Sequence, residues 1–203
     1  SWGISRRSTR GDDIPPRPPG QCGPRRGLAR VAPDPESRAS PMLLPATTVP
    51  SARLRLVNDR PPRPERGYVL HWITAARRLR SSFALDLAVE LARAFGRPLV
   101  VLEALRVGYP HASDRLHAFV LSGMAENAEE AARANVVHHA YVERRPGEGS
   151  GLLEALAGDA CVVVTDDFPA FFLPRMVAAA AAKLDVAVVA VDSNGLVPMR
   201  AIS

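Results

Sequence analysis

The 203-residue chain contains little cysteine and no long apolar run. Of its two cysteines, Cys22 lies in a proline-rich region and Cys161 opens an apolar segment, so we expect both thiols to be free. Free thiols are typical of a reducing compartment. The longest apolar run, residues 176–182, is far shorter than the ~20 residues that span a membrane. Neither arginine pair of the N-terminal region is followed by the apolar stretch that an export signal needs. We therefore expect a cytoplasmic protein with no membrane partner.

Several signatures of catalysis and metal binding are absent as well. The run Gly147–Gly151 follows a predicted strand and precedes a predicted helix, but it lacks the Lys-Ser/Thr of a Walker loop and the spacing of a dinucleotide fingerprint. We interpret it as a flexible turn. No G-x-S-x-G elbow of a hydrolase occurs. His138 and His139 are adjacent on a predicted strand and face opposite sides of a sheet, which favours a structural or surface role. The sequence predicts no metal site.

Proline and positive charge are concentrated near the N-terminus. Residues 1–66 hold 13 of the 19 prolines and carry 13 arginines against 6 acidic residues, whereas residues 67–203 have 13 basic and 15 acidic residues. The positive charge therefore gives little support for a nucleic-acid surface on the folded part. A segment of this composition buries too little apolar surface to offset its ordering entropy, so we expect residues 1–52 to be disordered. Residues 1–41 are either translated sequence upstream of a start at Met42 or a basic arm that contacts DNA.

Apolar segments rich in β-branched residues alternate with helical patterns in the remainder of the chain. We expect strands at Tyr68–Ile73, Leu99–Leu105, Val136–Val142, Cys161–Thr165 and Val186–Val191. We expect helices at Phe83–Phe95, Ser113–Ala134, Leu152–Leu156 and Phe172–Leu184. Ser113 is a candidate N-cap, and Gly96 is a candidate C-terminal stop. Strict alternation with right-handed crossovers predicts an α/β domain at 68–192 with a doubly wound, Rossmann-like, five-stranded parallel sheet, preceded by a lead-in segment at 53–67.

Four groups of residues are informative when they are taken together, in their order along the chain. They are Tyr68–Ile73 with Arg77-Arg78 and Phe83-Ala84-Leu85, Arg115-Leu116 with Phe119–Met124, Val162–Asp166, and the last strand followed by Asp192–Met199. This set resembles the N-terminal α/β antenna domain of class II DNA photolyases over residues 68–203. The sequence departs from the family pattern at Ser82, where relatives usually have Asn, and in the loop Asp167–Phe172.

The resemblance implies a ligand crevice where the strand order reverses, between the first and fourth strands of the domain. Its lining would come from the ends of these strands and the segments that follow them, namely Ile73, Thr74, Ala75, Arg77, Thr165, Asp166, Asp167 and Phe168. Asp166 and Asp167 either bind a hydroxyl group or a metal, or form an N-cap or Asx-turn, and we favour the second interpretation. We interpret Arg77, Arg78 and Arg80 as an interface or solvent feature rather than a DNA contact.

In the photolyase family, reduced FAD in a C-terminal helical domain donates an electron to a cyclobutane pyrimidine dimer in damaged DNA, and an antenna pigment, a deazaflavin in some relatives, passes excitation energy to FAD. The resemblance thus implies part of a carbon–carbon lyase of DNA repair, with residues 193–203 beginning the linker to an FAD domain beyond Ser203. We expect this chain alone to contain no catalytic residue and to repair no dimers. The alternative is a stand-alone nucleotide-binding domain of the universal-stress type, which cradles phosphates on glycines where this chain has Thr165–Pro169.

Overall fold

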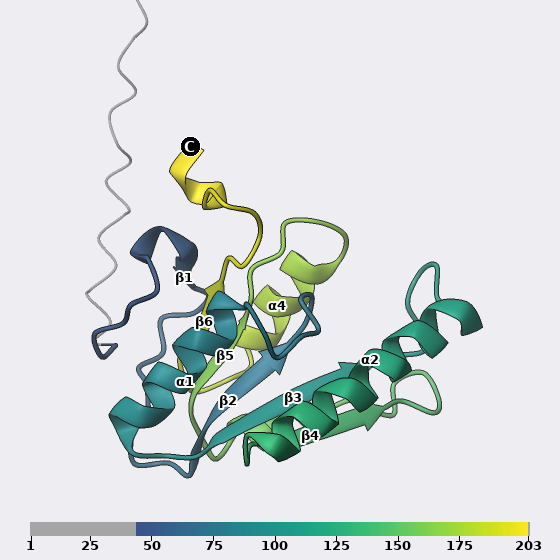
Figure 1. Ribbon diagram of the computed structural model, residues 1–203, viewed down its shortest axis with the longest axis horizontal. Helices are drawn as coiled ribbons and strands as arrows, with labels where there is room; N and C mark the ends of the chain where they lie inside the picture. Colours follow the sequence, from purple (N-terminus) through teal and green to yellow (C-terminus); the bar gives the residue numbers. More distant parts are fainter. Residues whose placement is uncertain (1–43, 203) are drawn as a thin grey trace, which may run out of the picture. The chain divides into compact units, whose positions relative to one another are not determined.

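The structure, a computed structural model, describes residues 44–202, so Cys22, Met42 and the rest of residues 1–43 lie outside the described residues. The described part forms an α/β domain on one six-stranded sheet of order β1-β6-β5-β2-β3-β4 (Figure 1). The strands are β1 (Leu54–Leu56), β2 (Tyr68–Ile73), β3 (Leu99–Leu105), β4 (Val137–Val142), β5 (Ala160–Asp166) and β6 (Val188–Val191). The α-helices are α1 (Phe83–Phe95), α2 (Asp114–Arg133), α3 (Leu152–Ala157) and α4 (Leu173–Ala181), with 3-10 turns η1 (Ser51–Arg53) and η2 (Met199–Ile202).

The sheet runs outward in both directions from β2. This strand lies between β3 and β5 and is parallel to both. β4 continues the parallel sheet beside β3, and β6 continues it beside β5. The strand order therefore reverses between β2 and β5, where we expected the crevice. The α/β class and the parallel sheet are confirmed, and each predicted strand lies within two residues of its observed bounds.

Helices cover both faces of the sheet (Figure 1). On one face, α1 packs Leu87 and Leu91 against alternate strand residues such as Val69, Val101 and Val162. On the other face, α3 and α4 pack Ala157, Val177 and Ala181 against the intervening residues Leu70, Leu102 and Val163. Successive strand residues face opposite sides of a sheet, so strands buried on both faces need nearly continuous apolar sequence.

The helix ends follow the expected capping residues. The Ser113 hydroxyl accepts a hydrogen bond from the Leu116 N–H at 3.3 Å and begins α2. Ser82 caps α1 in the same way, through the Leu85 N–H at 3.4 Å. Gly96 ends α1 in the left-handed region with φ +61°, which glycine adopts without steric cost.

The sheet has six strands rather than the five that we expected, and the sixth, β1, lies in the segment that we expected to be a lead-in. It pairs antiparallel with β6, with Leu54 opposite Val191 and Leu56 opposite Val189. Three residues are too few to display a strand period in the sequence. The strand forms because it covers the otherwise open edge of β6, a long-range pairing that no local pattern indicates.

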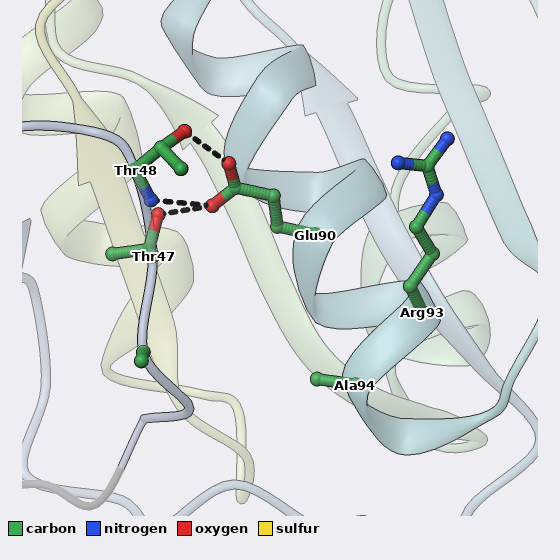
Figure 2. Close-up of a pocket in the computed structure, with 6 residues that line it drawn as sticks. Thr47, Thr48, Glu90, Arg93 and Ala94 are labelled. Carbon is green, nitrogen blue, oxygen red and sulfur yellow. Dashed lines mark hydrogen bonds between the residues drawn. The ribbon is translucent and has the colours of Figure 1, made fainter.

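Residues 44–52, which we expected to be disordered, lie against α1. Val49 is buried in the core. The hydroxyl groups of Thr47 and Thr48 donate hydrogen bonds to the carboxylate of Glu90, and the Thr48 N–H donates at 3.0 Å (Figure 2). These bonds, that of Thr47 first, hold the pKa of Glu90 below its ordinary value. The composition argument failed here because a short segment attached to a folded domain needs no core of its own.

Replacing Leu87 by alanine tests the packing of α1. Leu87 is fully buried, so Leu87→Ala is expected to lower the free energy of unfolding by about 2–5 kcal/mol. The matched change Leu121→Ala, at an exposed position of α2, is expected to alter it by less than about 0.5 kcal/mol. Urea denaturation followed by circular dichroism measures both variants. Equal effects at the two positions would contradict the core described above.

Candidate functional site

A hollow of about 340 Å³ lies at the point where the strand order reverses. Three segments form it, and each follows the carboxyl end of a strand: the β2–α1 loop, the β5–α4 loop and the segment after β6. The lining residues are Ala75, Ala76, Arg78, Asp166, Asp167, Phe168, Ser193, Asn194 and Gly195. Doubly wound sheets bind ligands outside the carboxyl ends of their strands at this reversal, so the hollow is the candidate site.

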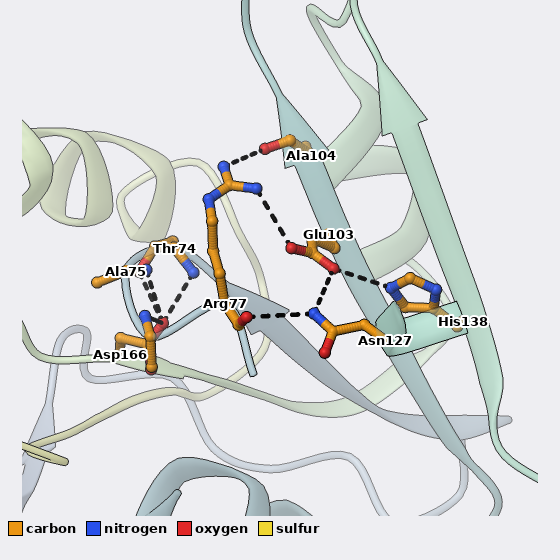
Figure 3. Close-up of polar contacts among 9 residues, drawn as sticks. Thr74, Ala75, Arg77, Glu103, Ala104, Asn127, His138 and Asp166 are labelled. Carbon is orange, nitrogen blue, oxygen red and sulfur yellow. Dashed lines mark hydrogen bonds and ion pairs between the residues drawn. The ribbon is translucent and has the colours of Figure 1, made fainter. Parts of the chain in front are cut away.

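Asp166, the last residue of β5, fastens the β2–α1 loop to the sheet. It is only 5% exposed, and its Oδ2 accepts the backbone N–H groups of Thr74 at 2.9 Å, Ala75 at 2.8 Å and Ala76 at 3.2 Å (Figure 3). The Thr74 hydroxyl donates to the same oxygen at 3.4 Å. Oδ1 is shielded from solvent and has no hydrogen-bond partner among the described residues. Asp166 therefore reaches across the strand reversal and does not form the N-cap or Asx-turn that we favoured.

Asp167 connects the β5–α4 loop to both ends of the described chain. Its carboxylate accepts two hydrogen bonds from Arg55 of β1, at 2.7 and 3.2 Å, and one from Arg200 of η2 at 2.6 Å. Burial acts to raise the pKa of Asp167, but the hydrogen bonds from Arg55 and Arg200 outweigh it, so the pKa lies below its ordinary value. The side chain is thus committed to two ion pairs and does not cap the next segment.

A buried arginine holds the segment that follows β6. The Arg53 guanidinium lies 4.2 Å from the centre of the Phe83 ring. It donates to four backbone carbonyls, those of Asp192, Asn194, Gly195 and Leu196, at 2.8–3.5 Å. The carboxylate of Asp192 accepts the N–H groups of Asn194 at 2.8 Å and Met199 at 2.7 Å. This segment, expected as the start of a linker, therefore packs back onto the domain and forms one wall of the hollow.

Arg77 lies on the other side of the β2–α1 loop, away from the hollow lining. Its guanidinium donates to the Ala104 carbonyl at 2.7 Å and pairs with the buried Glu103 at 3.4 Å (Figure 3). Glu103 Oε2 lies 3.0 Å from the Asn127 amide nitrogen and 3.2 Å from His138 Nε2. The Asn127 amide also donates to the Arg77 carbonyl at 3.2 Å. The network joins the loop to β3, β4 and α2.

The Glu103 network keeps a carboxylate ionised in the interior. Burial acts to raise the pKa of Glu103, but hydrogen bonds from His138 and Asn127 and the charge of Arg77 lower it below the ordinary value. An ionised Glu103 can only accept, so the Nε2 of His138 carries the proton that it shares with Oε2. The His138 side chain is 4% exposed, whereas its neighbour His139 is exposed, so the two histidines face opposite sides as the strand period predicts.

The structure brings together half of the residues expected at the site. Ala75, Asp166, Asp167 and Phe168 line the hollow. The remaining four do not: Ile73 is in the core, Thr74 and Thr165 lie behind the lining with their hydroxyl oxygens 3.4 Å apart, and Arg77 faces Glu103. Arg77 has a φ of +37°, a local backbone turn that the sequence does not reveal.

Sequence reasoning missed the wall formed by Ser193, Asn194 and Gly195, and also missed Ala76 and Arg78 in the lining. These residues are small or polar and directly follow a predicted strand. Ligands of such sheets bind outside the carboxyl ends of the strands near the reversal. If this rule is applied to every strand near the reversal, it predicts these residues as part of the crevice.

The glycine-rich run after β4 is held by a protein carboxylate. Glu143 is buried and accepts the N–H groups of Val107 at 3.0 Å, Gly147 at 2.7 Å and Gly149 at 3.4 Å. These bonds, that of Val107 first, hold the pKa of Glu143 below its ordinary value. Two of the N–H groups that a phosphate loop would offer to an anion, those of Gly147 and Gly149, are thus engaged within the protein.

Metal and membrane features are not found in the described part of the chain. Residues 44–202 contain no group of three or more His, Cys, Asp or Glu side chains suited to a metal ion. No helix among them has the length and apolar character needed to cross a membrane.

The fold and the hollow define a doubly wound α/β domain with a ligand-sized site at the strand reversal. Over 153 residues, which are 74% of the chain, the sequence is 30% identical to the deoxyribodipyrimidine photo-lyase of Methanothermobacter thermautotrophicus. This match supports a relation to the photolyase family, and the chain spans about a third of the length of this relative (33%). No family model matches the chain. The structure of a universal stress protein from Archaeoglobus fulgidus matches 49% of this chain and 75% of its own chain, with 16% sequence identity and a TM-score of 0.35.

The substitution Asp167→Asn tests the role of the two ion pairs through its pH dependence. The folded-state pKa of Asp167 is lowered relative to the unfolded value of about 3.9, so the carboxylate stabilises the folded state above about pH 4 and loses this effect as the pH falls through the folded-state pKa. We expect the wild type to be more stable than the variant at neutral pH, and the difference in urea midpoint to shrink below about pH 4. A difference that persists unchanged in acid would refute the ion-pair explanation.

Removing Arg77 should expose the cost of an unpaired buried carboxylate. Arg77→Ala leaves Glu103 without its arginine and is expected to lower the free energy of unfolding by about 3 kcal/mol. The double variant Arg77→Ala/Glu103→Gln should recover part of this loss, because a neutral amide needs no counter-charge. Thermal and urea unfolding measure the stability of the wild type and both variants. If the double variant is less stable than Arg77→Ala, the two side chains do not act as a pair.

Proposed function

We propose that residues 68–192 form the antenna-pigment domain of a class II photolyase. The observation that carries this proposal is the 30% identity to a deoxyribodipyrimidine photo-lyase over 153 residues. The order of the segments from Tyr68–Ile73 to Asp192–Met199 supports the class II assignment. The proposed role of the domain is to bind a pigment that absorbs light and passes the energy to reduced FAD.

The hollow at the strand reversal is the proposed pigment site. Its volume of about 340 Å³ falls in the range of ~300–1,000 Å³ that is usual for small-molecule sites. Ala75, Ala76 and Phe168 offer apolar surface for a planar ring, while Arg78 and Ser193 offer hydrogen-bond donors at its edge. A deazaflavin-like pigment combines a flat apolar ring system with polar edge groups, which is the chemistry that these residues suit.

FAD and damaged DNA are proposed as ligands of a separate domain of the functional enzyme. Apolar side chains of the β5–α4 loop and of the segment after β6 are exposed, with Phe171 at 82% and Leu196 at 97%. Phe172 and Val197 are also exposed in the same two segments. Exposed apolar groups of this kind mark interaction surfaces, so we propose that they contact the flavin-binding domain.

Ligand titration of the purified 203-residue chain tests the proposed function. We expect 5-deazariboflavin to bind with saturable quenching of its fluorescence, and we expect ATP neither to bind nor to compete. In a parallel assay with FAD, a reductant, light and a dimer-containing oligonucleotide, the chain alone is expected to repair no dimers. Binding of ATP without binding of the deazaflavin would support a universal-stress-type domain and refute the pigment role.

A further inference from the structure

We propose that the domain forms a dimer with a second copy of this chain, in which the free edge of β4 pairs antiparallel with itself and α2 packs beside α2 of the second copy. This inference goes beyond the proposed function and does not depend on it. β4 is the outermost strand beside β3 and contributes no residue to the hollow at the strand reversal.

The two edges of the sheet are unequal. One edge is covered by β1, which pairs with β6. At the other edge, no strand within residues 44–202 pairs with the outer side of β4 (Figure 1). The outer side of a strand carries unpaired backbone N–H and C=O groups, which are a template for another strand. The sequence of β4, VHHAYV, contains neither the proline nor the lysine that commonly protects such an edge, and Val137 is 59% exposed.

The side of α2 above this free edge carries no charge. α2 contacts β3 and β4, and its buried residues Met124, Asn127 and Ala131 face the sheet. Glu130 lies on the side of the helix that faces the middle of the sheet, because it pairs with Arg80 of the β2–α1 loop. At about 100° of rotation per residue, the opposite side faces the free edge of β4. Its residues are exposed, and they are Ala118, Leu121, Ala125, Ala128 and Ala132.

The strand edge and the helix side fit the same two-fold axis. The five exposed residues recur at alternating intervals of three and four, which is the spacing of residues that face a partner helix. Neighbouring strands lie about 4.8 Å apart, so a two-fold axis beside β4 leaves two helices seated over β3 and β4 roughly 10 Å apart. Helices pack at about 8–10 Å, and short side chains suit this approach. Pairing of β4 with itself therefore brings the two copies of α2 into packing distance.

Charge at the ends of α2 favours a second copy in antiparallel orientation. Asp114 begins the helix and Arg133 ends it, and both are exposed. In an antiparallel pair centred on Ala125, Asp114 of each copy lies within about one helical turn of Arg133 of the other. A parallel pair would place like charges together, and the helix dipoles also favour the antiparallel pair. The surface is thus complementary to itself, as a closed two-fold dimer requires.

Sedimentation of the purified 203-residue chain tests for the dimer. The interface consists of one strand pair and one helix pair, so we expect a dissociation constant of about 1–100 μM, and dilute solutions contain the monomer. The average mass should rise from that of the monomer, 21.8 kDa, towards twice this value as the concentration increases. A chain that stays monomeric up to about 1 mM overturns the proposal.

The variant Ala125→Glu tests whether α2 forms the interface. It places two carboxylates side by side at the two-fold axis, so we expect the dissociation constant to rise about a hundredfold or more. The matched control Phe119→Glu adds the same charge to the same helix, at a side chain that is 77% exposed on the side away from the free edge. The control should dimerise as the wild type does, and circular dichroism verifies that both variants are folded. Equal effects at the two positions, or a larger effect at Phe119, overturn the proposed interface.

Cysteine cross-linking with a short bismaleimide tests the orientation. The experiment uses a Cys22→Ser background, in which the remaining Cys161 is buried. Ala125→Cys should cross-link to itself. Ala118→Cys and Ala132→Cys should cross-link to each other when the two proteins are mixed, and neither should cross-link to itself. Cross-linking of Ala118→Cys to itself indicates parallel helices and overturns the antiparallel dimer.

Hydrogen exchange tests the pairing of β4 separately from the packing of α2. The outward N–H groups of Val137–Val142 should exchange more slowly at concentrations at which the dimer forms. The variant Ala125→Glu should abolish this slowing at the same concentrations. Unchanged exchange in β4 of the cross-linked Ala125→Cys dimer overturns the pairing of β4 with itself.

Discussion

Buried carboxylates at the carboxyl ends of the strands hold the loops at this end of the domain, including the loops that line the candidate site. Asp166, Glu143 and Asp192 each accept two or more backbone N–H groups from neighbouring segments. These loops have no helix or strand partner for those N–H groups, and an unpaired buried N–H is costly. One carboxyl side chain satisfies several of them at once and fixes the loop position. At the same end of the sheet, Glu103 holds the β2–α1 loop through its ion pair with Arg77.

The arginines of the N-terminal part of the domain complement this arrangement. Arg53 binds the carbonyl groups of the segment after β6, and Arg55 pairs with Asp167 of the β5–α4 loop. Both lie at or beside β1, which pairs with β6 at the edge of the sheet. The edge strand β1 and the preceding turn η1 therefore also place two guanidinium groups, one against each of two walls of the hollow. Several positive charges of this region are thus used inside the domain rather than on a nucleic-acid surface.

The elements with a clear local pattern could be predicted from the sequence, and the contacts between them could not. The run Cys161–Thr165 and the caps Ser113 and Gly96 were recognised because apolar continuity and capping are local properties. β1 was missed because three residues show no period. Arg77 was placed in the crevice because its neighbours are there, but a positive φ turns its side chain to Glu103. The wall after β6 depends on Arg53, which is more than a hundred residues away in the sequence.

The position of the hollow bears on how an antenna domain would work. The β5–α4 loop and the segment after β6 line the hollow with Phe168 and Gly195, and they also expose Phe171 and Leu196. Phe171 has a backbone φ of +60°, which is uncommon for a non-glycine residue, although its side chain is 82% exposed and contacts little of its own domain. A partner domain seated on these two segments would lie next to the bound ligand. In the proposed antenna role, energy transfer would depend on the distance and orientation of the pigment relative to a flavin in that domain, and the hydrogen-bonded loops around Asp166 are suited to fixing the position of the pigment.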